Sequence, residues 1–378
     1  MMNRIYLDHA ATSPMHPEVA ETFSQALGTV YGNPSSMHGT GRIARKALDD
    51  ARRVFARSIN ANDPEIIFTS GGTEADNLAI FGTAAKKPGG HIITSAVEHH
   101  AVLHACEKLE RDGYRVTYLP VDENGLVRAE DVKNSLRSDT ILVTIMLGNN
   151  EVGTVQPIEE IGELLKGTDA VFHTDAVQAY GVLPIDVEKL HVDLLSVSAH
   201  KLNGPKGTGF LYQRKGVALA PLFYGGEQER KRRAGTENVP AITAFAKAVE
   251  IALSTMPVKT ALYLTFKDTF KNVLTEQGIP FKENGANTLP HILNLSIPEI
   301  DIESFLVNLD IAGISASSGS ACTAGSMDPS HVLVAMYGGQ ADELRNSIRF
   351  SFGLGLDARQ VQEAALKTAQ ICKRLALK

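Results

Sequence analysis

The sequence predicts an α/β fold in which a mainly parallel central sheet carries helices on both faces. Short apolar runs, typical of buried strands, alternate with segments whose apolar residues recur at helical spacing. This alternation extends from about residue 17 to residue 255, and a smaller α+β pattern follows it. Strands separated by helices favour a parallel sheet, because each helix returns the chain to the same end of the sheet.

The elements are predicted in the following order. Helices are expected over 17–28, 39–60, 73–86, 99–112, 158–166 and 239–255, and strands over 65–70, 91–96, 114–120, 140–146, 170–178, 194–197 and 209–213. Pro257 is expected to end the last of these helices, because proline disrupts a helix interior. We therefore expect a large domain over 15–256. The residues beyond it form a smaller unit that ends in a helix over 357–377.

Composition narrows the possible classes of protein. The chain has 378 residues, enough for two substantial cores, and 43% of them are hydrophobic. Its net charge of −6 gives no electrostatic basis for binding nucleic acid or an anionic membrane. We see no apolar run of about 20 residues that would span a membrane and no apolar core of a secretory signal. The three cysteines are too far apart for a disulfide framework or a zinc motif. We expect a cytoplasmic protein without a metal site.

Two reactive side chains follow successive predicted strands. Lys201 comes after the apolar run 194–197, and Asp175 ends the preceding run. Lys201 alone is more typical of a surface position at a strand end. An acid and a lysine at the ends of successive strands, however, meet at the sheet edge where α/β folds place ligands. Pyridoxal phosphate (PLP) requires such a pair, a lysine for a Schiff base and an acid for the pyridinium nitrogen.

A candidate phosphate cradle lies earlier in the chain. A predicted strand runs into Gly71, Gly72 and Thr73 at the start of a predicted helix. Glycines let backbone N–H groups approach an anion, and a helix N-terminus adds positive potential. Glycine turns before helices are common, so this turn by itself is weak evidence for a phosphate site.

The sequence resembles the cysteine desulfurases, the branch of fold-type-I PLP enzymes related to class V aminotransferases. The matching motifs cover nearly the whole chain in family order: 6–12, 32–36, 173–176, 198–201 and 317–322. The resemblance implies a fold-type-I PLP-transferase in which residues 1–14 join 257–378 in the small domain. It implies conversion of L-cysteine to L-alanine. Selenocysteine lyase and aminotransferase activities on the same fold remain alternatives, as does a catalytically silent sulfur carrier.

The resemblance also assigns roles to individual residues. Lys201 and His99 are expected to be catalytic, and His99, rather than its neighbour His100, is expected to stack on the cofactor ring. A substrate carboxylate is expected to bind Arg349 with help from Asn33 and Asn150. The cofactor contacts that the resemblance implies are Lys201, Asp175, Gln178, His99, Gly72, Thr73, Asn150, Ser198 and His200, with Thr236 contributed by the other subunit of a homodimer.

Cys322 is predicted to be the nucleophile that receives sulfur. It lies in a segment of small residues, 317–326, which has little to pack and is therefore expected to form an accessible loop. Cys106 and Cys372 fit helical patterns and are expected to be buried. By resemblance, Cys322 carries a persulfide that passes to an acceptor, either an iron–sulfur scaffold or a tRNA-thiolation enzyme. We expect the segment 321–330 to be poorly ordered.

Overall fold

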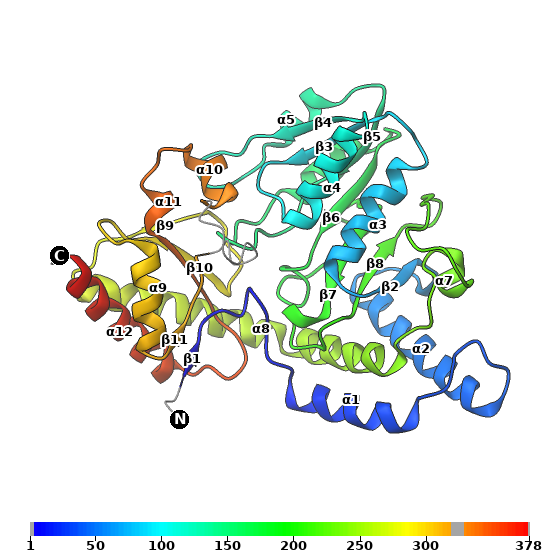
Figure 1. Cartoon of the computed structure of the whole chain (residues 1–378), viewed down its shortest axis with the longest axis horizontal. Helices are drawn as coiled ribbons and strands as arrows, with labels where there is room; N and C mark the ends of the chain where they lie inside the picture. The colour runs from blue at the N-terminus through cyan, green and yellow to red at the C-terminus, as the bar shows by residue number, and fades with distance from the viewer. Residues whose placement is uncertain (1–3, 319–328, 377–378) are drawn as a thin grey trace.

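The computed structural model of the protein describes residues 4–318 and 329–376 (Figure 1). Strands alternate with helices over most of its length, so the α/β prediction is confirmed. The helices are α1 (Pro17–Thr29), α2 (Gly39–Ser58), α3 (Gly72–Ala84), α4 (His100–Arg111), α5 (Ala129–Ser135), α6 (Ile158–Leu165), α7 (Gln228–Lys231), α8 (Val239–Glu276), α9 (Ile302–Ile311), α10 (His331–Tyr337), α11 (Glu343–Asn346) and α12 (Ala358–Ala376).

Seven of the described strands form one large sheet in the order β2-β8-β7-β6-β5-β3-β4. All neighbours pair in parallel except β8, which is antiparallel to both β2 and β7. The strands of this sheet are β2 (Ile66–Thr69), β3 (His91–Ser95), β4 (Arg115–Leu119), β5 (Thr140–Thr144), β6 (Val171–Asp175), β7 (Leu194–Ser198) and β8 (Gly209–Gln213). The carboxyl ends of β2, β3, β5, β6 and β7 therefore lie along one edge of the sheet.

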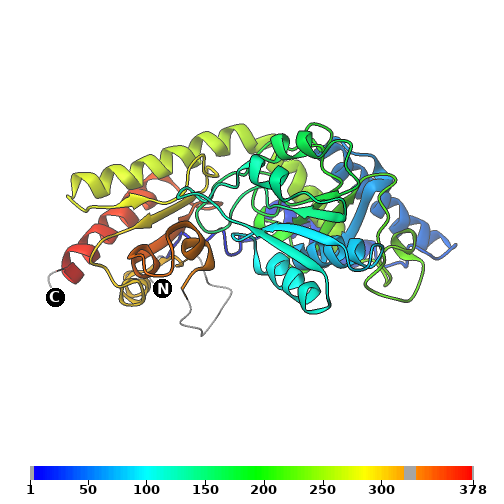
Figure 2. The ribbon, with the colours of Figure 1, turned by 90° about the horizontal axis from the view of Figure 1, so that it is seen from above.

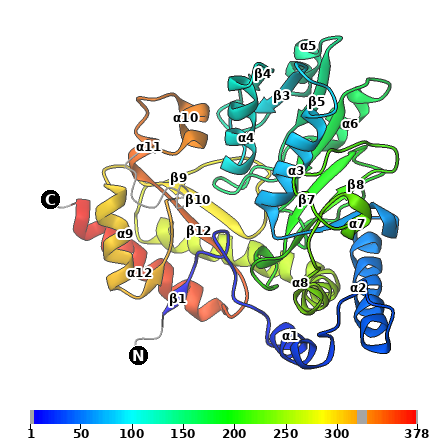
Figure 3. The same cartoon turned by 45° about the vertical axis from the view of Figure 1, so that its right-hand side comes forward.

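Alternating side chains of the strands supply two buried faces. On β7, Leu194 packs in a cluster with residues of α3, whereas Leu195 packs in the main core with α2 and the first part of α8. On β5, Leu142 and Val143 divide in the same way. This follows from the two-residue period of a strand. Figure 3 shows α3 and α4 in front of the large sheet, with α1 and α8 below it.

A second hydrophobic cluster lies between α9, α12, the second part of α8 and two small sheets. One sheet has the order β12-β10-β9, all antiparallel, and the other pairs β1 with β11 in parallel. Ile5 and Leu7, at the start of the chain, pack in this cluster. The strands concerned are β1 (Ile5–Tyr6), β9 (Lys282–Glu283), β10 (Ile292–Ser296), β11 (Ile314–Ser315) and β12 (Ser347–Ser351).

The prediction that Pro257 ends a helix is wrong. Helix α8 is 38 residues long in total and continues through Pro257. Figure 2 shows it running from the large sheet to the small unit. Proline costs one backbone hydrogen bond in a helix interior. Both flanks of α8 are held by packing, since Phe245 belongs to the main core and Phe266 to the second cluster. By length and composition α8 could also span a membrane, but half of its most apolar stretch is buried within the protein.

Candidate active site

Side chains from the ends of several strands meet in a cavity of about 420 Å³ at the carboxyl edge of the large sheet. The N-terminal segment contributes Ala10 and Ala11 to its wall, and β12 contributes Arg349. The predicted site residues that line it are Gly72, Thr73, His99, Asn150, Asp175, Gln178, Ser198, His200, Lys201 and Arg349. Motifs that are far apart in the sequence are thus brought together in one place.

Lys201 lies in a short 3-10 turn directly after β7, and the N-terminal segment fixes its amine. Its Nζ donates to the backbone carbonyls of Ala10 at 2.5 Å and Ala11 at 2.8 Å. Gln178 Nε2 donates to the same Ala10 carbonyl at 2.9 Å. Two predicted cofactor contacts, from the turns after β6 and β7, are therefore held by one backbone segment.

Asp175 is the last residue of β6 and is buried. Its Oδ1 accepts the backbone N–H of Val177 at 2.8 Å. Burial raises the pKa of the carboxyl to about 6, although this hydrogen bond and the nearby Lys201 oppose the shift. A cationic ring nitrogen beside Asp175 would favour the ionised carboxylate again, because an opposite charge offsets desolvation.

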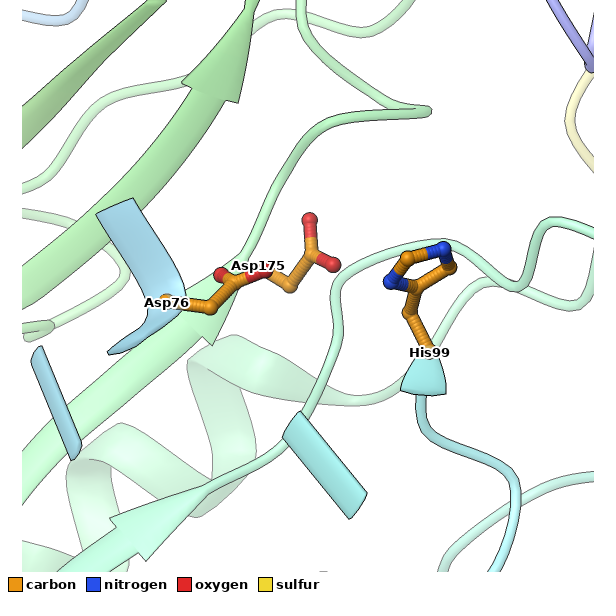
Figure 4. A group of neighbouring side chains, drawn as sticks. All are labelled: Asp76, His99 and Asp175. Carbon is orange, nitrogen blue, oxygen red and sulfur yellow. The ribbon is translucent and has the colours of Figure 1, made fainter. Parts of the chain in front are cut away.

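His99 caps the N-terminus of α4 and faces Asp175 (Figure 4). Its Nδ1 accepts the backbone N–H of Ala101 at 3.1 Å, which places the proton of the neutral ring on Nε2. Burial lowers the pKa of His99 to about 4, and the nearby Lys201 lowers it further. The imidazole is therefore neutral at neutral pH and can accept a proton only when its surroundings change.

The turn between β2 and α3 has the shape of an anion cradle. Gly71 has φ of +152°, and a Cβ on Gly72 would lie only 2.8 Å from a methyl group of Val177. A hollow beside this turn is lined by Gly72, Thr73, Ser198 and His200. Glycine at these positions keeps space at the N-terminus of a 13-residue helix, where exposed N–H groups and the helix dipole favour a phosphate.

Arg349, on β12, contributes its guanidinium group to the wall of the same cavity. Its Nη1 donates to the Asn150 carbonyl at 2.7 Å and its Nη2 to Asp8 Oδ1 at 2.9 Å. Within the part of the chain that the structure describes, the buried Arg349 Nε and Asn150 Oδ1 have no hydrogen-bond partner. Buried polar atoms of this kind are costly unless a ligand pairs with them.

Three predicted site residues are not part of this arrangement. Asn33 and Thr236 are exposed, and neither lines the cavity. Cys322 lies in 319–328, outside the described residues, and so does most of the segment 321–330 for which we predict poor order. Cys106 and Cys372 are buried.

The sequence reasoning missed two acids at the site. Asp8 pairs with Arg349, and Asp76 lines the cavity from α3. Asp76 had a readable signal, since it follows the glycine turn within a helix whose neighbouring residues Ala75, Leu78 and Ala79 are small or apolar. An acid on such a buried helix face requires a specific partner. Asp8 gave no comparable signal, because its partner is 341 residues away.

A mainly parallel sheet whose edge combines a lysine, an acid and a phosphate cradle defines a PLP-dependent enzyme. The model of the class-V aminotransferase family matches residues 5–363. The chain belongs to this family, whose members are PLP-dependent.

Named relatives are similar over the whole chain. A protein from Bacillus subtilis (strain 168) with the provisional name cysteine desulfurase IscS 1 is 61% identical, over 99% of this chain and 100% of the relative. The cysteine desulfurase IscS of Dictyoglomus turgidum is 47% identical, over 94% and 91%. Among solved structures, a NifS-like protein matches with a TM-score of 0.91 at 35% identity, covering 98% of this chain and 100% of that one. A structure described as SspA in complex with cysteine matches with a TM-score of 0.82 at 38% identity, covering 92% and 98%.

The residues present fit the cofactor. The glycine turn leaves room for a phosphate, Asp175 is a buried acid that needs a positive partner, and the Lys201 amine lies at the same cavity. Asp76, His99 and Asp175 also place ligand atoms within 4.8 Å of one another, a spacing that suits a metal ion. The phosphate cradle and the lysine beside them favour the organic cofactor instead.

Proposed function

We propose that this protein is a PLP-dependent cysteine desulfurase that transfers the sulfur of L-cysteine to Cys322. The reaction converts L-cysteine and the Cys322 thiol into L-alanine and a Cys322 persulfide, so all atoms are conserved. The observation that carries this proposal is the convergence of the Lys201 amine, the Asp175 carboxyl and the Arg349 guanidinium on one cavity. The names of the relatives and the cysteine-bound neighbour support the choice of substrate.

Each part of the cavity has a role in holding the cofactor. Lys201 would hold the cofactor covalently, and Asp175 would pair with its pyridine nitrogen. His99, Gln178 and Asn150 would make further contacts with the ring. The phosphate is held by Gly72, Thr73, Ser198 and His200. When bound, PLP supplies an electron sink that weakens bonds at the α- and β-carbons of an amino acid.

The chain's own residues carry out binding and proton transfer. Arg349 binds the substrate carboxylate through its Nε, with Asn150 and Asn33 as further contacts. The Lys201 amine, once free of its covalent link, moves the substrate's Cα proton, with neutral His99 as a second proton carrier. Cys322, as a thiolate, attacks the substrate sulfur as the carbon–sulfur bond breaks.

We also propose that two copies of the chain form a homodimer, with Thr236 reaching the cofactor phosphate of the other subunit. Large apolar side chains lie exposed near Asn33 and Thr236 in the sequence, among them Tyr31, Met37 and Tyr224. Within each copy, residues 15–256 form the large domain and residues 1–14 with 257–378 form the small one. Met37→Glu with Tyr224→Glu should yield monomers in sedimentation experiments, whereas Val258→Glu, at another exposed apolar position, on α8, should not.

The sulfur acceptor is an iron–sulfur scaffold or a tRNA-thiolation enzyme of the cytoplasm. Protein loaded with ³⁵S persulfide would be incubated with each candidate, and the acceptor that gains label identifies the pathway.

The desulfurase proposal itself is tested by supplying L-cysteine to the purified holoenzyme without a reductant. L-alanine and protein-bound persulfide should appear in equal amounts during the first turnover. An enzyme that forms no alanine, or that forms it only when a keto acid is added, would not be a desulfurase.

A further inference from the structure

A second buried acid lies directly beside Asp175. Asp76, on α3, and Asp175, on β6, place carboxylate oxygens within 4.8 Å of each other and of a ring nitrogen of His99. Figure 4 shows the Asp175 carboxyl between Asp76 and His99. Asp76 is 1% exposed, and the proposed function gives it no role. A buried acid adjoining the cofactor's acid needs a physical explanation.

Among the residues that the structure describes, no cation is found beside Asp76 that would balance a negative charge. His173 Nε2 lies 3.7 Å from Asp76 Oδ1, but burial lowers the pKa of His173 to about 3, so its ring is neutral. That ring is already held by Thr144 Oγ1 at 2.8 Å and Ser196 Oγ at 2.9 Å. Glu98 is a further buried acid whose pKa burial raises to about 8, and it supplies no balancing charge either.

The hydrogen bonds of the Asp76 side chain are incomplete. Ser196 forms a hydrogen bond with it that opposes the rise in its pKa, but burial and the neighbouring Asp175 are the larger effects. Within the described residues, the buried Oδ1 of Asp76 has no hydrogen-bond partner. The Asp175 carboxyl, a strong acceptor when ionised, places an oxygen within 4.8 Å of the Asp76 carboxyl. Rotation about the last side-chain torsion of an aspartate is soft, so the two groups can approach hydrogen-bond distance.

Two buried carboxyl groups this close resist ionising together, because like charges in a site of low dielectric constant repel strongly. Burial and the neighbouring Asp175 both raise the pKa of Asp76 well above its usual value. The pair therefore holds one proton. Asp175 must be the charged member if it is to pair with a protonated pyridine nitrogen, which leaves the proton on Asp76.

We propose that Asp76 is a positioning residue that remains protonated and donates a hydrogen bond to Asp175. This inference rests on the proposed function, because it concerns how Asp175 meets the cofactor. The hydrogen bond orients the Asp175 carboxylate and keeps its charge available for the ring nitrogen. Ser196 holds Asp76 in place, and Ser196 is itself the register partner of Asp175 in the sheet.

Two substitutions of Asp76 distinguish a protonated hydrogen-bond donor from an ionised Asp76 and from a residue that is dispensable. The amide of Asp76→Asn can still donate a hydrogen bond to Asp175, so this variant should retain PLP with a dissociation rate within about threefold of the wild type. Asp76→Ala has no donor and should release PLP at least tenfold faster. Asp175→Asn is the comparator, because it removes the charge itself.

The protonation state of the cofactor can be read directly with ¹⁵N-labelled PLP. The ¹⁵N chemical shift of the ring nitrogen should stay that of a pyridinium in the wild type and in Asp76→Asn, and move toward the unprotonated value in Asp76→Ala. If Asp76→Asn instead behaves like Asp175→Asn, Asp76 is the ionised member and the proposal is wrong. Wild-type behaviour of Asp76→Ala would equally overturn it.

An infrared measurement keeps the proposal testable if Asp76→Ala does not fold. Wild-type protein should show the C=O stretching band of a buried protonated carboxyl that Asp76→Asn lacks, and an unchanged band in that variant would contradict the proposal. Failure of the proposed function would look different: wild-type protein would bind no PLP or produce no alanine. Wild-type protein that passes both tests while Asp76 proves dispensable refutes only this inference.

Discussion

Arg349 and Asp8 form an ion pair, with 2.9 Å between Nη2 and Oδ1, that joins strand β12 to the N-terminal segment. Arg349 Nη1 is also occupied, by the Asn150 carbonyl. In the proposed function, a substrate carboxylate would reach the guanidinium through Nε and compete with Asp8 for Nη2. Asp8 thus holds the arginine in a conformation ready for an anion, which reduces the ordering cost of binding.

Arg349→Lys should lower kcat/KM for L-cysteine by about 10- to 100-fold, because hydrogen bonds to charged groups contribute about 1.5–3 kcal/mol and lysine cannot reproduce the planar fork. Steady-state kinetics measure the effect. Arg4→Lys, at the exposed pair with Asp310, is a matched control and should have no effect. Unchanged kinetics for Arg349→Lys would exclude it as the carboxylate site.

Purified protein should be yellow with bound PLP, and borohydride should abolish the visible absorption band by reducing the covalent linkage to Lys201. Peptide mass spectrometry should then place the adduct on Lys201, since its amine is the lysine nitrogen at the cavity wall. Lys201→Ala should bind PLP without forming an adduct. An adduct on another lysine would disprove the assignment.

Cys322→Ser should bind PLP and L-cysteine but release no sulfide in the presence of a reductant, because only the sulfur acceptor has been removed. Asp175→Asn should instead weaken every step that uses the cofactor as an electron sink, including the first spectral change on adding cysteine. The comparison requires sulfide assays and absorption spectra of both variants. A serine variant with most of the wild-type rate would rule out Cys322 as nucleophile.

His291 is buried, and burial together with nearby positive charge lowers its pKa to about 3. As the pH falls below 6.5, the unfolded chain binds a proton at this residue that the folded protein does not, so stability is lost. The loss continues until the pH approaches the folded-state value. His291→Asn should therefore lessen the fall in unfolding free energy between pH 6.5 and 5 by up to about 1.4 kcal/mol per pH unit.

Urea unfolding of the apoprotein at several pH values measures this slope. His104→Asn, at an exposed position, should leave the slope close to that of the wild type. If the unfolding free energies of His291→Asn and the wild type fall equally with pH, His291 does not cause the loss of stability at low pH.

Ser330 links the start of α10 to the active site. Its Oγ accepts the backbone N–H of Leu333 and donates to the buried carboxylate of Glu151. Ser330→Ala should cost about 1–2 kcal/mol of unfolding free energy, because a helix cap is lost and a buried acid loses a partner. Ser254→Ala, which removes an exposed hydroxyl within α8, should cost much less. Equal stabilities of the two variants, measured by urea unfolding, would contradict this role.

Most elements of the large domain could be predicted within a few residues because local patterns determine them. Apolar runs predicted the strands, and the positions of Lys201 and Asp175 at strand ends predicted that they meet at a common edge of the sheet. Helix α8 was predicted too short because the local rule for Pro257 ignored Phe266 and its neighbours, which extend the helix into a second core. Asp8 and Asp76 were missed because only the assembled fold reveals their partners.

The N-terminal segment has a consequence for biosynthesis. Its Leu7 carbonyl and Ala10 N–H bond to Ser351, and its Ala10 and Ala11 carbonyls hold Lys201. Ala10 and Ser351 are 341 positions apart in the sequence, so the N-terminal segment meets this partner only after the residues between them have been synthesised. The large sheet can form during synthesis, because its contacts are nearer in sequence. The cavity that takes the cofactor is completed last, so a chain truncated before β12 has the sheet but lacks the closed site.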